Sequence, residues 1–473
     1  MYIISDYKLI HDSIHGYIPI SNILCHIIDS KQFQRLRKLK QLGACCYIYP
    51  NAVHTRFEHS IGTCHIANKI LESIVRTTNI NDMDNYLSQI PELKDYLDKT
   101  YTSQNKLRCL DNYIIEMIKI GALCHDLGHG PFSHLFDDFF LPCVKKENHI
   151  LDSHEERSCS LVEIIIKENK FLNKIISDDM IKFIKSIINP SSSHTGFIYM
   201  IVSNYMNGLD VDKYDYIVRD SYVTGLQTKF NFERLVNHIR VIDNIICYQE
   251  QAVNDIIELY ETRYQLHKNV YSHKGVISAQ FMIIEIFKHI DKFIGLSDSI
   301  KDMKKFILMT DEYILTCYNM IKPSNKTDVT TLSKINNIIE KLDSHKLYSH
   351  VLTHVSNVKI NITKKDFKIP SDILIYSNTI GYISGNKSNP LNNIYVFNTK
   401  IKENDIITKR KININENRLL LSNIIQEHLT MIFYKKKKNI VVNNMIKNIF
   451  KDYIANNNKI NENNEEKILD IFN

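Results

Sequence analysis

The chain has 473 residues, of which 44% are hydrophobic and 10% aromatic, a composition that allows a large core and excludes an intrinsically disordered protein. Its formal net charge of +6 is compatible with an anionic substrate but is too small to indicate nucleic-acid binding by itself. The first residues show no basic region followed by an apolar run, and the sequence contains no apolar run of about eighteen residues and no C-x-x-C pair. We therefore expect a soluble intracellular protein, cytoplasmic or nuclear, without membrane spans or disulfides.

The first elements expected are a hairpin and a helix. Residues 8–20 mix β-branched residues with Gly and Pro and predict a short β-hairpin. Residues 27–43 place apolar side chains at helical spacing and end in a glycine, which predicts one amphipathic helix. The basic residues on its other faces are typical of a solvated surface.

A second helix is expected around residues 56–75. Apolar residues recur at helical spacing from Ile66 to Val75, so Arg56 and His59 lie at or near its start, where free N–H groups and the helix dipole favour anions. Residues 77–108 are polar and irregular, and we interpret them as a surface insertion.

Residues 116–134, EMIKIGALCHDLGHGPFSH, carry most of the recognisable chemistry. An apolar helix should stop at Gly128 or Gly130, with His125 and Asp126 near its last turn. Adjacent helical residues point about 100° apart, so this pair converges only on a small ion above the helix end. An isolated His-Asp pair is more often a surface feature, but the neighbouring histidines favour a divalent metal.

A further helix is predicted within residues 208–225. Asp212, Tyr216 and Asp220 are spaced by four and form one ridge, which either faces solvent or lines a cleft. Helical patterns continue through residues 255–290.

The character of the chain changes beyond about residue 365. Residues 372–383 and 393–400 alternate as strands, and residues 417–434 predict a helix packed on them. We therefore expect a mainly α protein, with a helical catalytic domain over residues 1–300 and a smaller C-terminal α+β lobe over residues 301–473 for regulation or oligomerisation. Its polar tail should begin at about residue 455.

Two imidazoles and two carboxylates form the candidate metal set, which suits manganese, iron, zinc or magnesium with open positions: His59, His125, Asp126 and Asp212. Such an ion lowers the pKa of bound water and polarises a phosphoryl oxygen. Two cations can hold phosphates and four further groups can relay protons: Arg56 and Lys213, and His129, His134, His154 and Asp137. The constellation predicts phosphoester hydrolysis.

Three motifs in order, H-x-R-F-E-H-S, C-H-D-L-G-H-G-P-F-S-H and L-D-V-D-K-Y-D-Y-x-x-R-D, follow D-x-x-Q-F-Q-R-L-R-x-L-K-Q-L-G. They resemble the HD-domain deoxynucleotide triphosphohydrolases, specifically the catalytic core of the animal enzyme that carries a sterile-α-motif domain. The resemblance covers nearly the whole chain, and we expect no sterile-α-motif domain before Met1. It implies an HD-domain helical core and metal-dependent hydrolysis of a dNTP to the deoxynucleoside and inorganic triphosphate.

The resemblance also implies roles for single residues. The metal ligands match His59, His125, Asp126 and Asp212. The proton-handling group matches His134, Asp137 and His154, with His134 nearest the scissile bond. Phosphate contacts match Arg56, His129 and Lys213, and contacts to the 3′-hydroxyl match Tyr216 and Asp220. The wall that excludes a 2′-hydroxyl matches Gln41, Leu42 and Tyr271, while Ser272 departs from the expected glutamine.

The same resemblance implies allosteric control by GTP or dGTP. A guanine-nucleotide activator site matches Lys8, Asp29, Gln34 and Arg37. A second activator site matches Arg234 and Lys274, but Gln251 and Asp255 stand where a lysine and an asparagine are expected, which should weaken triphosphate binding there. We expect a homo-oligomer, either a dimer or a tetramer.

Two other functions remain open. An HD-type phosphodiesterase, nucleotidase or nuclease needs only the metal motif, and the basic runs Lys409–Lys411 and Lys435–Lys438 would then serve nucleic acid, although such runs are usually solvated surface. A catalytically silent binding protein is disfavoured by the presence of all three proton-handling residues. Product analysis separates the three hypotheses.

Overall fold

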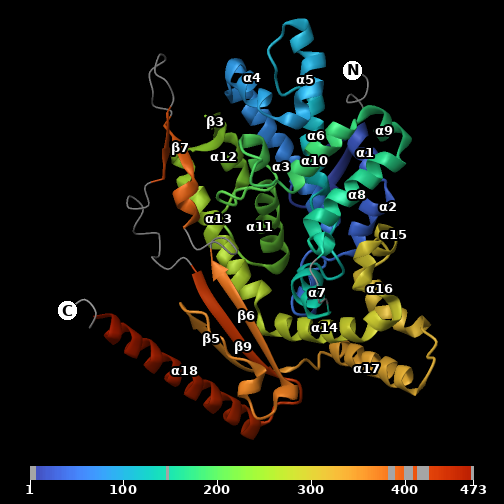
Figure 1. Cartoon of the computed structure of the whole chain (residues 1–473), viewed down its shortest axis with the longest axis vertical. Coiled ribbons are helices and arrows are strands. Elements are labelled where there is room, and N and C mark those ends of the chain that lie inside the picture. The colour runs from blue at the N-terminus through green and yellow to red at the C-terminus, as the bar shows by residue number, and fades with distance from the viewer. Residues whose placement is uncertain (1–6, 145–148, 382–388, 399–407, 413–425, 470–473) are drawn as a thin grey trace.

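The computed structural model describes residues 7–144, 149–381, 389–398, 408–412 and 426–469. It is mainly helical with small sheets, one of them in the C-terminal part, which confirms the predicted fold class (Figure 1). Among the residues so described, no helix combines the length and the apolar character needed to cross a membrane.

The predicted hairpin is present as β1 (Tyr7–Asp12) and β2 (Gly16–Ser21), which pair antiparallel. The single helix predicted over residues 27–43 is wrong. The chain instead forms α1 (Asn22–Ile28) and α2 (Lys31–Gln34), because Ser30 accepts the backbone N–H of Phe33 and caps a new helix.

Arg35 follows α2 and is not solvated as predicted. It is buried, and its guanidinium donates to the carbonyl oxygens of Leu127, His129 and Met309. These bonds tie the N-terminal segment to the loop that carries the central histidines.

Three helices form the centre of the molecule: α3 (Arg56–Thr77), α6 (Asn112–Cys124) and α11 (Val211–Thr224). α3 packs against both of the others and begins in a capping box between Thr55 and Glu58. α6 ends before the predicted stop, with His125 as its C-cap, so Asp126 lies in the following turn. The early stop lets the Gly128 backbone approach His154 so closely that a Cβ would lie 2.0 Å from its carbonyl oxygen.

The segment predicted to be irregular, residues 77–108, is largely helical. It contains α4 (Ile80–Ser88) and α5 (Lys94–Thr100), which lie at one end of the molecule (Figure 1). Leu87, Leu93 and Leu97 are buried, which explains why the segment orders despite its polarity. Its origin as an insertion stays a prediction.

Further helices surround this centre: α7 (Leu141–Val144), α8 (His154–Glu168), α9 (Lys170–Ile175), α10 (Asp178–Ile188), α12 (Phe232–Asn237), α13 (Val253–Gln265), α14 (Lys274–Ile294), α15 (Met303–Phe306), α16 (Asp311–Thr316) and α17 (Lys326–Asp343). The first of the two longer sheets has the order β3 (Ile239–Ile242), β4 (Ile245–Gln249), β7 (Tyr395–Phe397), β8 (Lys409–Lys411). β7 lies within the strand predicted at residues 393–400, of which residues 399–400 lie outside the described residues. It runs parallel to β4, so this strand joins a sheet of the predicted catalytic domain.

The C-terminal sheet is antiparallel, with the order β5 (Ser349–Ser356), β9 (Gln426–Tyr434), β6 (Ile373–Gly381). β6 confirms the strand predicted at residues 372–383 within the described residues, which extend here to Gly381. The helix predicted over residues 417–434 is wrong where the structure describes it, because β9 is the central strand; residues 417–425 lie outside the described residues.

β9 is buried on both faces of that sheet. Met431 and Phe433 face a cluster that includes Ile277 of α14, whereas Ile432 faces a cluster that includes Phe450 of α18 (Ile440–Leu469). α18 extends to Leu469, so the segment from about residue 455, predicted to be a polar tail, continues this helix. The predicted domain boundary at residue 300 stays a prediction.

Candidate active site

The four residues predicted to hold a metal lie together where α3, α6 and α11 meet. His59 Nε2 lies 3.2 Å from Asp212 Oδ1 and 3.4 Å from Asp126 Oδ2. His125 Nε2 lies 3.6 Å from the same Asp212 oxygen and 3.4 Å from Asp126 Oδ1. Ligand atoms of His59, His125 and Asp212 lie within 4.8 Å of one another, and Asp126 belongs to an adjoining group of the same kind with His129 and His154.

The donor set fits a divalent cation. The Nε2 atoms of His59 and His125 are buried, and neither forms a hydrogen bond of acceptable geometry within the described parts of the chain. Ligand atoms held at about 2.1 Å from an ion and at right angles lie about 3 Å apart, close to the spacings seen. The other ring nitrogens are fixed, His59 Nδ1 by Asp215 Oδ2 and His125 Nδ1 by the Ala122 carbonyl oxygen, both at 2.8 Å.

The electrostatics of the cluster also favour a cation. Burial would raise the pKa of Asp126, but Arg56 and the nearby imidazoles outweigh burial and hold it well below its usual value. Burial would lower the pKa of His59, but the carboxylates of Asp212 and Asp215 outweigh burial and raise it to about 10. The cluster therefore attracts positive charge strongly.

Asp215, which the sequence analysis missed, is the hub behind His59. Its side chain is fully buried, and Arg219 donates to both of its oxygens at 2.8 and 2.9 Å. Gly62 of α3 leaves the space it needs, because a Cβ there would lie 1.9 Å from Asp215 Oδ1. The signal in the sequence was the Asp-x-x-x-Arg spacing on α11, which permits an ion pair across one helical turn.

The proton-handling residues predicted from the sequence also lie together, beside the metal cluster. The rings of His129 and His154 stack with centroids 3.9 Å apart, and the ring of His134 lies 5.0 Å from that of His129. His129 Nε2 lies 3.4 Å from Asp126 Oδ1, and its Nδ1 lies 3.2 Å from Asp137 Oδ2. The group thus connects directly to the metal cluster.

Burial lowers the pKa of His154 to about 3, with a contribution from the neighbouring His129, so His154 is neutral near pH 7. The side chain of His134 is 63% exposed, so it faces the open side of the group. Asp137 is paired with Arg157, another residue that the sequence analysis missed. Arg157 is fully buried and also donates to the Gly128 and Leu151 carbonyl oxygens, both at 2.7 Å.

The residues predicted to face the sugar form a second polar group. Tyr271 donates its hydroxyl to Asp220 Oδ2 at 2.6 Å, and His54 Nε2 lies 2.8 Å from Asp220 Oδ1. The backbone N–H of Gln41 bonds to the His54 carbonyl oxygen at 3.0 Å. The side-chain oxygen of Gln41 is buried with no hydrogen-bond partner among the described residues. Leu42 and Tyr216 are half-buried.

The two cations predicted to contact phosphate are both paired with carboxylates. Arg56 is buried, bonds to Asp126, and donates from Nε to Ser133 Oγ at 2.8 Å. Lys213 Nζ lies 3.1 Å from Asp210 Oδ2. Asp210 was missed by the sequence analysis.

The residues of the first predicted activator site surround the junction of α1 and α2. Lys8 Nζ lies 3.8 Å from Asp29 Oδ2, and both side chains are exposed. Arg37 Nε donates to Gln34 Oε1 at 3.0 Å, and its guanidinium lies 3.5 Å above the ring of Phe57.

In the second predicted set, Arg234 Nε lies 3.3 Å from Asp255 Oδ2. Its Nη2 also donates to the Gln251 carbonyl oxygen at 3.3 Å. Lys274 is the first residue of α14. The acidic residue that departs from the family pattern therefore neutralises one of the two cations that match it.

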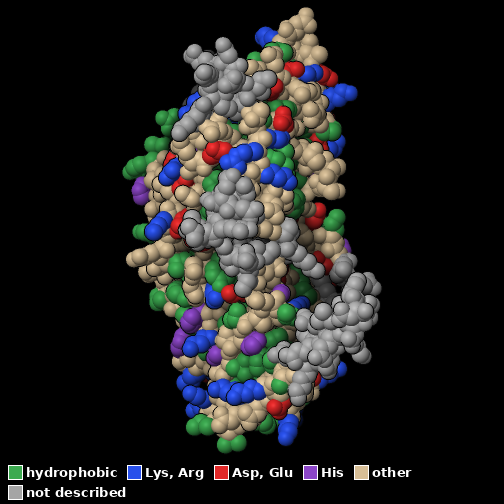
Figure 2. Space-filling model, turned by 90° about the vertical axis from the view of Figure 1, so that its left-hand side faces the viewer, with side chains coloured by type: hydrophobic (Ala, Val, Ile, Leu, Met, Phe, Trp, Pro, Cys, Tyr) green, Lys and Arg blue, Asp and Glu red, His purple; other side chains and the backbone are tan. Residues whose placement is uncertain are grey.

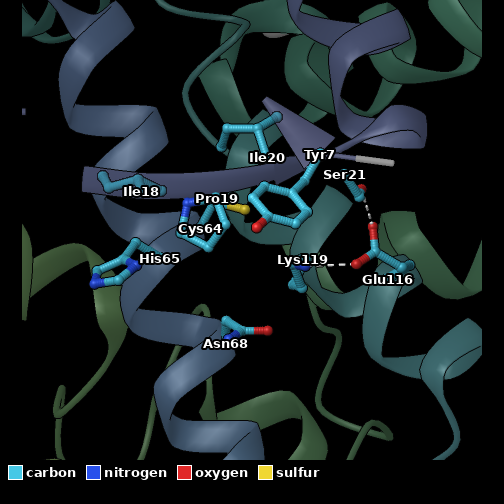
Figure 3. A pocket seen from close by; sticks show the side chains of 10 residues that line it. All are labelled: Tyr7, Ile18, Pro19, Ile20, Ser21, Cys64, His65, Asn68, Glu116 and Lys119. Atoms are coloured by element: carbon cyan, nitrogen blue, oxygen red, sulfur yellow. Dashed lines mark hydrogen bonds and ion pairs between the residues drawn. The ribbon is translucent and has the colours of Figure 1, made fainter. Parts of the chain in front are cut away.

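A separate pocket lies between β2, α3 and α6, outside the predicted site residues. Glu116 accepts hydrogen bonds from Ser21 and Lys119 at 2.6 and 2.5 Å. Figure 3 shows this group in the pocket, with His65 and Asn68 contributed by α3. Burial, aided by His15, lowers the pKa of His65 to about 4.

No protein-family model matches the chain. It is 41% identical over 416 residues to an HD domain-containing protein of Acanthamoeba polyphaga mimivirus, covering 84% of this chain and 86% of the relative. It is 32% identical over 462 residues to the deoxynucleoside triphosphate triphosphohydrolase SAMHD1 homolog of Dictyostelium discoideum, covering 95% and 81%. It is 31% identical over 401 residues to the human SAMHD1 enzyme, covering 77% and 58%. The chain thus belongs to the HD-domain family of SAMHD1-like deoxynucleoside triphosphate triphosphohydrolases.

Proposed function

We propose that the chain hydrolyses deoxynucleoside triphosphates to the deoxynucleoside and inorganic triphosphate, with one divalent ion, manganese, iron, magnesium or zinc, held by His59, His125, Asp126 and Asp212. The observation that carries the proposal is the group of His59, His125 and Asp212, whose ligand atoms lie within 4.8 Å of one another, with Asp126 in the adjoining group. The names of the relatives supply the substrate class.

The bound ion would activate water and polarise a phosphoryl oxygen. Arg56, His129 and Lys213 would hold the phosphates, and His129 is already oriented by Asp137. His134, exposed beside His129, would protonate the departing 5′-oxygen of the deoxynucleoside. His154, which lies 4.0 Å from Asp137, would complete the proton-handling group.

The sugar would lie against Tyr271, whose hydroxyl is fixed by Asp220. Tyr216 and Asp220 would contact the 3′-hydroxyl, while Gln41 and Leu42 complete the wall. A 2′-hydroxyl placed against such a wall has neither space nor a partner, so ribonucleotides would bind poorly.

A guanine nucleotide, GTP or dGTP, would bind at Lys8, Asp29, Gln34 and Arg37 and activate the enzyme. The proximity of Lys8 to Asp29 and of Gln34 to Arg37 supports this assignment. The Arg234–Asp255 ion pair argues for a weaker second site that includes Lys274, and hence for a homo-oligomer, dimer or tetramer, whose assembly depends less on a second nucleotide.

The HD phosphodiesterase or nuclease alternative gains little support from the basic runs. Lysine and arginine side chains gather on the lower part of the face in Figure 2. In the two runs, however, Arg410 lies 2.7 Å from Glu250 and Lys436 lies 2.8 Å from Asp372, so part of their charge is already neutralised.

Product analysis tests the proposal. Purified protein is incubated with Mn²⁺ or Mg²⁺ and each dNTP, with and without GTP, and the products are separated by anion exchange. We expect deoxynucleoside and triphosphate, and at least a 1,000-fold loss, as an order-of-magnitude estimate, in Asp212→Asn. Asp178→Asn is the matched control, because Asp178 also lies in the first turn of a helix but is 82% exposed. Turnover of oligonucleotides or monophosphates with intact dNTPs would overturn the proposal.

A further inference from the structure

The turn of the first hairpin is connected to the metal cluster by a buried chain of hydrogen bonds. His15, between β1 and β2, places its Nε2 2.6 Å from Asp215 Oδ1, and the other oxygen of Asp215 lies 2.8 Å from His59 Nδ1. All three side chains are fully buried. We propose that His15 is a positioning residue that fixes His59 as a metal ligand by acting through Asp215.

The chemistry of Asp215 fixes the direction of each hydrogen bond. An ionised carboxylate only accepts, so His15 donates from Nε2 and His59 donates from Nδ1. Arg219 donates to both oxygens of Asp215 at 2.8 and 2.9 Å, a bidentate pair that matches the ionised carboxylate. Donation from Nδ1 to Asp215 leaves Nε2, which faces Asp126 and Asp212, as the ring nitrogen available to a metal ion.

The surroundings of His15 explain why this residue is a histidine. Its Nδ1 is buried and has no hydrogen-bond partner in the described residues. An unpaired buried acceptor costs about 1–3 kcal/mol, so an apolar side chain would fill the space at lower cost. The bond from Nε2 to Asp215 is therefore the contact that requires an imidazole.

Asp12 places His15 in this position. Its Oδ1 accepts the backbone N–H groups of Ile14 and His15 at 2.8 and 2.9 Å, which shapes the hairpin turn. Its Oδ2 accepts from Arg219 at 2.9 Å. One carboxylate thus ties the turn to the same arginine that holds Asp215, so the hairpin and the metal ligand form one rigid unit.

The test measures metal binding by the whole protein. Mn²⁺ affinity is determined by titration calorimetry, and Co²⁺ binding by visible absorption, for the wild type, His15→Leu and His15→Gln. Loss of the bond in His15→Leu should weaken Mn²⁺ binding about 10-fold or more and change the Co²⁺ spectrum. His15→Gln retains a donor at the position of Nε2 and should restore affinity. His11→Leu is the matched control, because His11 lies exposed in the same hairpin.

Two outcomes would overturn the inference: wild-type Mn²⁺ affinity in folded His15→Leu, or equal losses in His15→Leu and His15→Gln. If His15→Leu does not fold, His15→Asn replaces it, since its shorter amide falls short of Asp215; affinity equal to that of His15→Gln would then count against the role. The inference rests on the proposed metal-dependent function. Failure of the wild type to bind metal would overturn that function. If the wild type binds metal and the His15 variants bind it equally well, only this inference is overturned.

Discussion

The candidate active site and the C-terminal sheet are both deeply buried, but the first buries mainly charged side chains and the second mainly apolar ones. The site buries charged groups such as Asp215, Arg219 and Arg157, each with several partners. The sheet buries side chains such as Ile432 and Phe433 between two helices. An intact buried ion pair fixes orientation and adds little net stability, but removal of one partner leaves an unpaired buried charge; apolar burial stabilises without fixing any chemistry. Substitutions in the site should therefore affect both function and stability, and those in the sheet should affect stability alone.

The largest effect is expected at Arg157. Arg157→Met would leave Asp137 buried without its cation and leave the Gly128 and Leu151 carbonyl oxygens without their donor. We expect a fall of about 3–5 kcal/mol in the free energy of unfolding, measured with urea, and a loss of about 100-fold in turnover per folded molecule. Arg157→Lys retains the charge and should lose less of both. An Arg157→Met protein with normal turnover would remove the distinction between the two regions.

A purely thermodynamic effect is expected at Phe433. Phe433→Ala should lower the free energy of unfolding by about 3–4 kcal/mol, because the side chain is fully buried in the sheet. Mn²⁺ affinity and turnover per folded molecule should be unchanged, since no predicted site residue lies on β9. A shift in either quantity would show that the sheet contributes to the chemistry.

A smaller, pH-dependent effect is expected at His65 of α3. Because burial lowers the pKa of His65 to about 4, the unfolded chain binds a proton more readily between pH 6.5 and pH 4. Stability from this group is therefore complete above pH 6.5 and falls with pH, by about 2 kcal/mol at pH 5. In His65→Asn this part of the acid sensitivity should be absent in urea unfolding at pH 7 and pH 5. The exposed His11→Asn serves as the control and should keep the wild-type slope.

The two regions also differ in how far the sequence predicts them. The grouping of the candidate metal ligands was predictable because short motifs at helix ends contain them, with His125 and Asp126 next to each other in the sequence. The residues behind it were not. His15 and Arg157 are separated in sequence from what they hold, and nothing local distinguishes a buried arginine from a solvated one.

The mistaken elements have equally local causes. β9 is covered on both faces, so its residues from Leu429 to Tyr434 show no regular alternation of apolar and polar side chains and cannot be told from a buried helix. In the N-terminal segment, the helical spacing of apolar residues continues across Ser30. The Ser30 side chain nevertheless accepts the backbone N–H of Phe33 and caps the start of a new helix. A pattern of apolar residues reports burial, and only capping and pairing decide the element.

Gly62 has a consequence for any attempt to make this enzyme more heat-resistant. A glycine inside a long helix is an obvious candidate for replacement by alanine, which should gain about 1 kcal/mol of helix propensity. Here the added methyl group would lie 1.9 Å from the oxygen of Asp215 that His15 contacts. A stabilisation strategy that considers only helix propensity would therefore select a substitution that clashes with the carboxylate that orients His59.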